Sequence, residues 1–205
     1  MAFYSDWKIK ETHVFLFIIG LVYTALLVVS SYLHGALWDD EIGFWKTSLE
    51  FSNQLLPSFA QIRNYNQFNT PFPFIVYGML EHLFKAGPFA ARLINFVFSI
   101  VIAFLIGWPG KKRSSTPIFA LLGLFLFPWY LWLSTRLYTD MLASFFVVWG
   151  IAFYLKKQHI LSGLSFFIAI SCRQFMLVFP LAVAFHELVL SIRYRRWPSL
   201  SFFLP

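Results

Sequence analysis

Six apolar segments constrain the fold of this chain more than any other feature. They cover residues 13–33, 89–108, 117–134, 141–155, 160–171 and 175–190. A helix needs roughly 20 mostly apolar residues to cross the hydrocarbon core of a bilayer, where it satisfies its own backbone hydrogen bonds. We therefore predict an all-α protein, a polytopic transmembrane helix bundle of five to six spans. The number depends on whether the last two segments are one span kinked at Pro180.

The composition agrees with a membrane environment. Hydrophobic residues make up 59% of the 205 residues and charged residues 12%, against about 45–50% and about 25% in an average soluble domain. So few charges cannot cover a soluble surface. The net charge of +7 is explained by basic residues at the ends of apolar segments, and not by nucleic-acid binding. The single cysteine, Cys172, excludes an intramolecular disulfide framework.

Basic residues predict which loops face the cytoplasm, because Lys and Arg concentrate in short cytoplasmic loops. The clusters are Lys8/Lys10, Lys111-Lys112-Arg113, Lys156-Lys157 and Arg193/Arg195/Arg196. All of them fall on one side if the apolar segment 70–84 lies at the membrane surface instead of crossing. We therefore predict a single module over 1–205 with a large exterior loop over 34–87. That loop carries juxtamembrane helices within 42–59 and 70–84.

Three consecutive acids, Asp39-Asp40-Glu41, follow the first apolar segment. Like charges side by side repel each other unless water, a cation or a basic partner neutralises them. The functional interpretation is a general base or a cation site. The alternative, which spacing alone favours, is an acidic and solvated helix start.

Two further positions carry charge near apolar segments. Arg136, Tyr138 and Asp140 lie in the short exterior loop before the fourth segment. Asp140 either caps the following helix or lines a polar cavity. The pair Arg173-Gln174 lies between two apolar segments, where an arginine is costly unless it pairs with a carboxylate, faces water or binds an anion. Arginine suits phosphate because its planar fork offers paired donors.

Together these features resemble the C-type superfamily of membrane glycosyltransferases, which use lipid-phosphate sugars. Three strings look most like the dolichyl-phosphate-glucose-dependent α-1,2-glucosyltransferases: Asp40-Glu41-Ile42, Leu137-Tyr138-Thr139-Asp140 and Arg173-Gln174. The chain departs from that family at Gly43-Phe44-Trp45, where the family has a histidine. Family enzymes are about twice as long, so the resemblance is to their N-terminal transmembrane module.

The resemblance implies an inverting transfer in which Asp40 is the base and Glu41 or Asp39 orients it. Arg173 is the first candidate to stabilise the leaving lipid phosphate, and Arg136 the second. Four residues are assigned to substrate binding beside Arg173: Asp140, Gln174, Arg136 and Tyr138.

The same resemblance implies the partners and the location. The partners are a lipid-phosphate sugar donor, a glycan or lipid-linked acceptor, and membrane lipids. A divalent cation at the acidic motif is an alternative for the phosphate chemistry, and no other cofactor is implied. The location is the endoplasmic reticulum membrane in a eukaryote and the inner or plasma membrane in a bacterium. We further expect Asp40, Asp140 and Arg173 to converge on one outward-facing cavity.

Two other functions stay open on the sequence alone. A transporter would also place Arg and acids along its helices, but it predicts paired and broken helices in two related halves, and the sequence has no such repeat. A non-catalytic membrane subunit, or a truncated fragment of an enzyme, would use the acidic motif only as a helix start.

Overall fold

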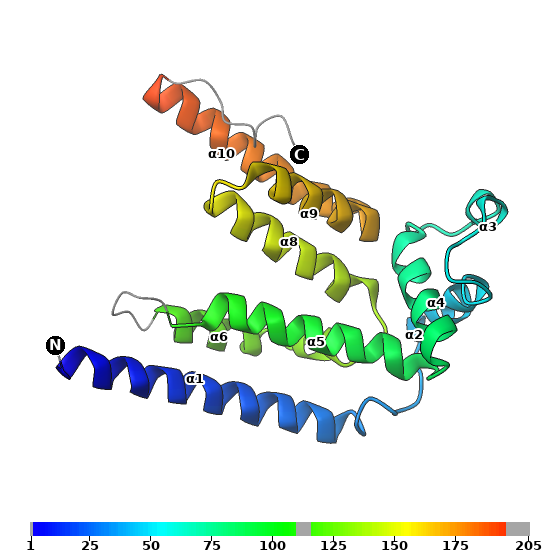
Figure 1. Ribbon diagram of the computed structural model, residues 1–205, viewed down its shortest axis with the longest axis horizontal. Helices are drawn as coiled ribbons and strands as arrows, with labels where there is room; N and C mark the ends of the chain where they lie inside the picture. The colour runs from blue at the N-terminus through cyan, green and yellow to red at the C-terminus, as the bar shows by residue number, and fades with distance from the viewer. Residues whose placement is uncertain (1, 110–115, 196–205) are drawn as a thin grey trace. The chain divides into compact units, whose positions relative to one another are not determined.

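The computed structural model describes residues 2–109 and 116–195, and the described residues form helices and no strands. The helices run in the order α1 (Ala2–Val29), α2 (Asp40–Glu50), α3 (Phe59–Arg63), α4 (Phe72–Phe84), α5 (Pro88–Gly107), α6 (Thr116–Leu126), α7 (Pro128–Ser134), α8 (Thr139–Leu155), α9 (His159–Cys172), a 3₁₀ helix η1 (Gln174–Leu177) and α10 (Val178–Tyr194) (Figure 1). The predicted all-α class is confirmed.

The chain divides into two compact units, which we describe separately. Unit 1 comprises Met1–Gly43 and Ala86–Tyr138, and unit 2 comprises Phe44–Lys85 and Thr139–Pro205. Each unit therefore joins a segment from the first half of the chain to a later segment that carries apolar helices.

In unit 1, α1, α5 and α6 pack around one apolar core. Its buried members are Phe15, Ile19, Tyr23, Leu33, Phe96, Ala103 and Leu121. The Tyr23 hydroxyl lies 3.2 Å from that of Tyr130, which donates to the backbone oxygen of Ser99 at 2.6 Å. Because these residues lie on α1, α7 and α5, the hydrogen bonds tie three helices together within an apolar environment.

The apolar segment predicted as a span over 117–134 is broken into two helices. α6 and α7 meet at an angle of 78°, and Phe127 between them is extended, with φ −84° and ψ 101°. The next residue is Pro128, which lacks an N–H and disfavours helical geometry in the residue before it. The segment 117–134 is therefore a pair of helices, and its crossing of the membrane as one span stays a prediction.

In unit 2, α8 and α9 form an antiparallel helical hairpin (Figure 1). A Cβ atom at Gly150 would lie 2.8 Å from the ring of Phe166, so glycine lets the two helices approach closely. The Ser162 hydroxyl donates to the backbone oxygen of Gly150 at 2.8 Å. Close approach at small residues is the usual way in which apolar helices pack in a membrane.

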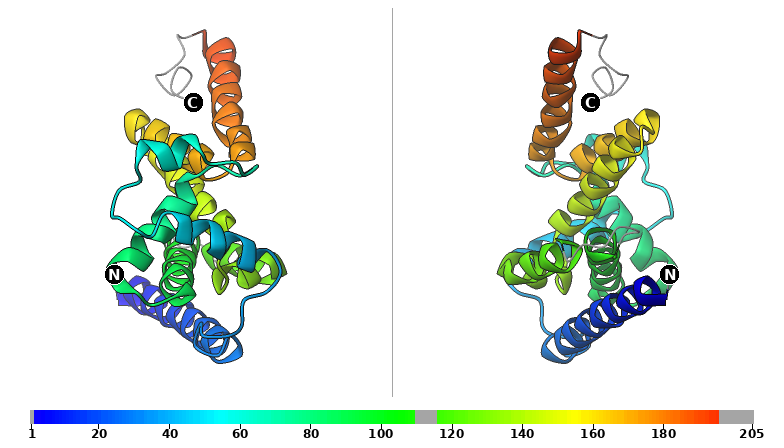
Figure 2. Two further views of the ribbon diagram at one scale, coloured as in Figure 1. Left: turned by 90° about the vertical axis from the view of Figure 1, so that its right-hand side faces the viewer. Right: turned by 90° about the vertical axis from the view of Figure 1, so that its left-hand side faces the viewer.

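The last two apolar segments are separated at Arg173, and not at Pro180. Arg173 is extended, with φ −148° and ψ 117°, between the end of α9 and the start of η1. Pro180 lies in the first turn of α10, where a proline disturbs little because the first N–H groups of a helix have no partner within it. Figures 1 and 2 both show α10 as one continuous helix.

Length and composition identify three described helices that can cross a membrane, Glu11–Val29, Pro88–Gly107 and Gln174–Tyr194, or four if the bent pair α6–α7 is one span. α4, α8 and α9 are apolar but shorter. A helical membrane bundle is therefore confirmed, and the total of five to six spans stays a prediction. The basic cluster Lys111-Lys112-Arg113 and Arg196 lie outside the described residues, as do the side chains of Lys8 and Lys10.

The predicted exterior loop contains helices where juxtamembrane helices were expected. Within unit 2, α4 covers the segment 72–84, and the later turns of α2 pack on it. A Cβ atom at Gly78 of α4 would lie 2.6 Å from the backbone oxygen of Ser48 and 2.8 Å from Cβ of Phe51. This contact sets the spacing of α2 and α4.

Replacing Gly78 with alanine should therefore destabilise the protein. The added methyl group meets backbone atoms that cannot rotate away, and overpacking of this kind costs about 1–3 kcal/mol. Thermal unfolding of the purified protein in detergent measures the effect. Gly123→Ala is the matched control, because nothing lies within 4 Å of a Cβ atom there. Equal unfolding temperatures for the two variants would contradict the proposed contact.

Candidate functional site

The three consecutive acids differ in their exposure to solvent. Asp40 and Glu41 form the first turn of α2, and Asp39 precedes that helix with a positive φ of 36°. The side chains of Asp39 and Asp40 are exposed, whereas Glu41 is fully buried. The expected acidic helix start is therefore present, but only two of its carboxylates are available to a ligand.

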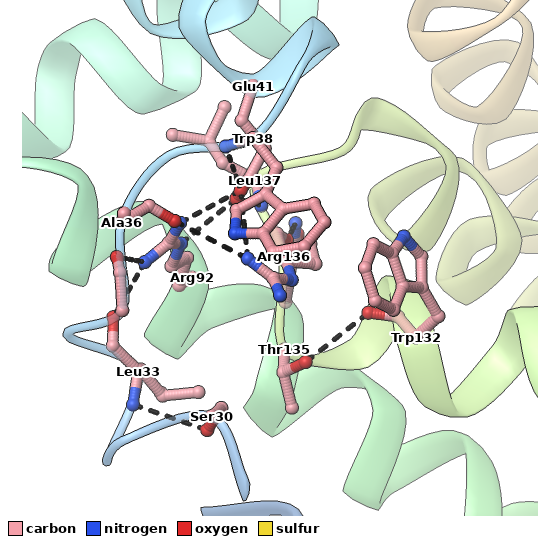
Figure 3. Close-up of polar contacts among 12 residues, drawn as sticks. Ser30, Leu33, Ala36, Trp38, Glu41, Arg92, Trp132, Thr135, Arg136 and Leu137 are labelled. Atoms are coloured by element: carbon pink, nitrogen blue, oxygen red, sulfur yellow. Dashed lines mark hydrogen bonds and ion pairs between the residues drawn. The ribbon is translucent and has the colours of Figure 1, made fainter.

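Glu41 is held by Arg92, a buried residue of α5 (Figure 3). Arg92 Nε donates to Glu41 Oε1 at 2.9 Å, and Arg92 Nη2 donates to Oε2 at 2.8 Å. The backbone N–H groups of Leu137 and Trp38 also donate to the carboxylate, at 2.7 and 3.1 Å. A carboxylate with this many donors joins α2, α5 and the loop before α8, and it is not free to remove a proton from a substrate.

The same arginine also orders the chain after α1. Its Nη1 donates to the backbone oxygens of Leu33 and Gly35 at 3.1 and 2.6 Å, and its Nη2 to that of Ala36 at 3.1 Å (Figure 3). All five N–H donors of the guanidinium are therefore used. Arg92 fixes the path of the backbone that leads into the acidic motif.

The electrostatics of Glu41 follow from these contacts. Burial alone raises the pKa of a carboxyl group, but the hydrogen bonds from Arg92 and Leu137 and the charge of Arg92 outweigh it, so the pKa of Glu41 is lowered from 4.5. Glu41 is therefore ionised at neutral pH and acts as a buried anchor.

Arg136 lies beside this anchor. Its Nη1 is 3.3 Å from Glu41 Oε2, and its guanidinium lies over two indole rings, 4.5 Å from the centroid of Trp132 and 5.4 Å from that of Trp38. Stacking on aromatic rings holds an arginine without neutralising it. Since Glu41 carries one negative charge between two arginines, the group of three is net positive.

A cavity of about 400 Å³ lies next to these residues in unit 1, lined by Asp39, Pro128, Trp129, Trp132 and Tyr138. Its volume is in the range of roughly 300–1,000 Å³ that ligand sites occupy. Burial raises the pKa of Tyr138, and the charges of Asp40, Glu41 and Asp39 add to that effect. Asp39 and Tyr138 form the polar end of the cavity, and Pro128, Trp129 and Trp132 of α7 form its apolar and aromatic wall.

Unit 2 contains a second polar cluster, around Arg173. Its Nη2 donates to Asp140 Oδ2 at 2.5 Å, and its Nη1 donates to Asn69 Oδ1 at 3.1 Å. Thr70 donates to the backbone oxygen of Cys172 at 2.9 Å, so the segment before α4 is fixed to the end of α9. Asp140 is the second residue of α8. It forms an ion pair with Arg173, so it does more than cap that helix.

The structure thus brings the predicted residues together in two groups. Asp39 and Tyr138 line the cavity of unit 1. Asp40, Glu41 and Arg136 belong to the same unit, and Asp140 pairs with Arg173 in unit 2. Gln174 is exposed at the start of η1. Their roles, and the convergence of Asp40 with Asp140 and Arg173, stay predictions.

Two residues of these groups were not predicted. Asn69 lies in a polar stretch of the kind found in many loops, so the sequence around it does not indicate a site. Arg92 has a signal in the sequence, because it is an arginine inside the apolar segment 89–108, and such a charge needs a partner. The argument that selected Arg173 therefore also applies to Arg92.

A divalent cation would find few ligands at the acidic motif. Among the described residues, no group of three or more His, Cys, Asp or Glu side chains is arranged to hold a metal ion. Glu41 is already committed to Arg92, so Asp39 and Asp40 are the carboxylates that would hold one.

Comparison with known proteins adds the family. The sequence profile of the DIE2/ALG10 family matches residues 72–198, which is more than half of the chain. The chain belongs to the DIE2/ALG10 family. This is a family of endoplasmic reticulum membrane enzymes, C-type α-1,2-glucosyltransferases, so the predicted resemblance is confirmed. No curated protein sequence matches the chain, and no solved structure does.

Membership of the DIE2/ALG10 family makes the protein an integral membrane protein of a glycosyltransferase family, whose members transfer a sugar from a donor to an acceptor. The matched residues include Tyr138, Asp140 and Arg173 but not the acidic motif. Any role of Asp39 and Asp40 therefore depends on the geometry of unit 1.

We expect Glu41→Gln and Arg92→Met to be strongly destabilising in this family member. Each leaves the other partner of a buried ion pair uncompensated, which costs about 3–5 kcal/mol. The double variant should lose less than the sum of the single losses, because neither charge is then left alone. Denaturation of the protein in detergent measures all three. Glu50→Gln, an exposed acid on the same helix, should change little, and strictly additive losses would contradict the pairing.

The contribution of Glu41 to stability should also depend on pH. Its pKa is lowered from 4.5 in the folded state, so the stabilisation is present above pH 4.5 and is lost as pH falls through the folded pKa. The difference in unfolding free energy between the wild type and Glu41→Gln should therefore shrink with acidification below pH 4.5. A difference that stayed constant from pH 7 to the acid limit of the assay would argue against an ionised Glu41.

Proposed function

We propose that the protein transfers a sugar, with inversion, from a lipid-phosphate donor to a hydroxyl group of a glycan or lipid-linked acceptor. The observation that supports this proposal is the cavity of unit 1, which the carboxylate of Asp39 and the phenol of Tyr138 line together with two tryptophans of α7. Aromatic faces and a few polar groups suit a sugar ring, which has apolar faces and a polar edge. Membership of a glycosyltransferase family supports the same class of reaction.

Asp40 is the proposed base. Glu41 is excluded from that role by its contacts with Arg92, which leaves Asp39 and Asp40 exposed. The charge of Asp40 raises the pKa of Tyr138 more than the charges of Glu41 and Asp39 do, and Tyr138 lines the cavity, which supports Asp40 as the base. Asp39 lines the wall and is proposed to bind sugar hydroxyl groups.

The reaction needs one proton transfer and one displacement. Asp40 removes the proton of the acceptor hydroxyl as its oxygen attacks the anomeric carbon. The bond from that carbon to the phosphate oxygen breaks, and the lipid phosphate leaves with the electron pair. A positioned base contributes about 10²–10⁴-fold to such a rate, and a fixed cation stabilises the charge that develops on the leaving group.

Arg136 is the proposed cation for the phosphate. It lies in the same unit as the cavity, against the wall residue Trp132, and belongs to the net positive group with Arg92 and Glu41. Arg173 stays a second candidate, because both of its terminal nitrogens are already bonded to Asp140 and Asn69. A phosphate at Arg173 would have to compete with the Asp140 carboxylate.

The test compares Asp40→Asn, Asp39→Asn and the control Glu50→Gln in nanodiscs, with radiolabelled polyprenyl-phosphate glucose and a lipid-linked glycan. Asp40→Asn should lower kcat by about 10²–10⁴-fold with donor affinity nearly unchanged. Asp39→Asn should raise KM more than it lowers kcat. Full activity of folded Asp40→Asn would remove Asp40 as the base.

A further inference from the structure

The bend between α6 and α7 breaks an apolar helix beside the cavity. Two backbone hydrogen bonds lie at the bend, from the N–H of Phe127 to the oxygen of Leu124 at 3.2 Å and from the N–H of Tyr130 to the oxygen of Phe127 at 3.0 Å. Non-helical backbone is tolerated at membrane depth only where it is covered by protein or lines a cavity. Pro128, which causes the break, lies on the cavity wall.

Large apolar side chains surround this bend and are exposed. Leu126 is 81% exposed, Phe127 56% and Trp129 62%. Trp129 belongs both to this group and to the cavity wall, so the exposed apolar surface at the bend continues into the cavity. We refer to Leu126, Phe127 and Trp129 as the α6–α7 corner.

The order of chemical groups along α7 defines what could occupy this surface. The helix starts at the apolar corner, continues with Trp132, and is followed by Arg136 over the Trp132 ring. Asp39 and Tyr138 form the polar end. A ligand that fills the site has an apolar chain, then one anionic group, then a hydroxyl-rich head.

We propose that the α6–α7 corner binds the isoprenoid chain of the lipid-phosphate substrate, which reaches the cavity sideways from the bilayer past Phe127 and Trp129. This assignment rests on the proposed function. It places the chain at the corner, the phosphate near Arg136 and the sugar between Trp132 and the acids. The bend then has a role, because a straight α6–α7 helix would continue past the cavity without turning Trp129 and Trp132 along its wall.

Photocrosslinking tests this proposal on the full chain. p-Benzoylphenylalanine replaces Phe127 in protein reconstituted into phosphatidylcholine nanodiscs, with the same replacement at Phe17 as control. Phe17 is 69% exposed on α1, also in unit 1. Polyprenyl phosphate, which carries no sugar to transfer, is the probe. We expect capture at 127 to exceed capture at 17 by about tenfold, the ratio that 1.4 kcal/mol of preferential binding gives.

Equal capture at the two positions, or capture of phosphatidylcholine in proportion to its abundance at 127, would overturn the proposal and make the corner an ordinary lipid-facing surface. Capture of a second protein chain in place of lipid would overturn it as well. A parallel arm with a polyprenyl-diphosphate glycan distinguishes the donor lipid from an acceptor lipid, since the preferred probe identifies which chain the corner holds.

Kinetics supply an independent measurement. Trp129→Ala should raise KM about tenfold for a long-chain polyprenyl-phosphate sugar and leave KM for a donor with two isoprene units nearly unchanged, whereas Phe17→Ala should affect neither. Equal effects on both donors would contradict chain binding at Trp129. If lipid is captured at 127 but no sugar is transferred, the proposed function fails while the lipid site stands. If sugar is transferred but lipid is not captured selectively at 127, the proposed lipid site fails while the proposed function stands.

Discussion

The ion pair between Arg92 and Glu41 is the interaction on which the rest of unit 1 depends. A guanidinium with all five donors bonded holds the carboxylate at the start of α2 and the backbone after α1 at once. The N–H of Leu137 donates to the same carboxylate. Because Arg136 and Tyr138 are the neighbours of Leu137 in the sequence, this bond also fixes their backbone near Glu41. The position of the cavity's polar end is therefore set by one buried pair.

This pair also separates the roles of three adjacent acids. Repulsion between neighbouring carboxylates is reduced when one of them is neutralised by an internal cation. Glu41 is the carboxylate that Arg92 neutralises, whereas Asp39 and Asp40 are exposed. The acidic helix start and the proposed catalytic group are thus compatible interpretations of the same three residues.

The fold class followed from the apolar segments, since long runs of apolar residues have few stable alternatives to membrane helices. The helix over 72–84 and the helix at the acidic motif were likewise predicted. The break at Phe127 was not, because it depends on how one proline acts on the residue before it. The separation of the last two segments at Arg173 was one of two alternatives, the other being a kink at Pro180. In the candidate site, spacing alone could not tell which acid is buried, since that depends on Arg92, 51 residues further along.

Arg92 is buried and Arg173 is partly buried, and the two arginines share a feature of their order in the sequence. Arg92 pairs with Glu41, and Arg173 pairs with Asp140, which lies 33 residues before it. In each pair the carboxylate precedes the arginine in the sequence. During synthesis from the N-terminus, each arginine therefore leaves the ribosome after the residue that will neutralise it. Neither arginine therefore has to be held beside an apolar helix while its counter-ion is still to be made.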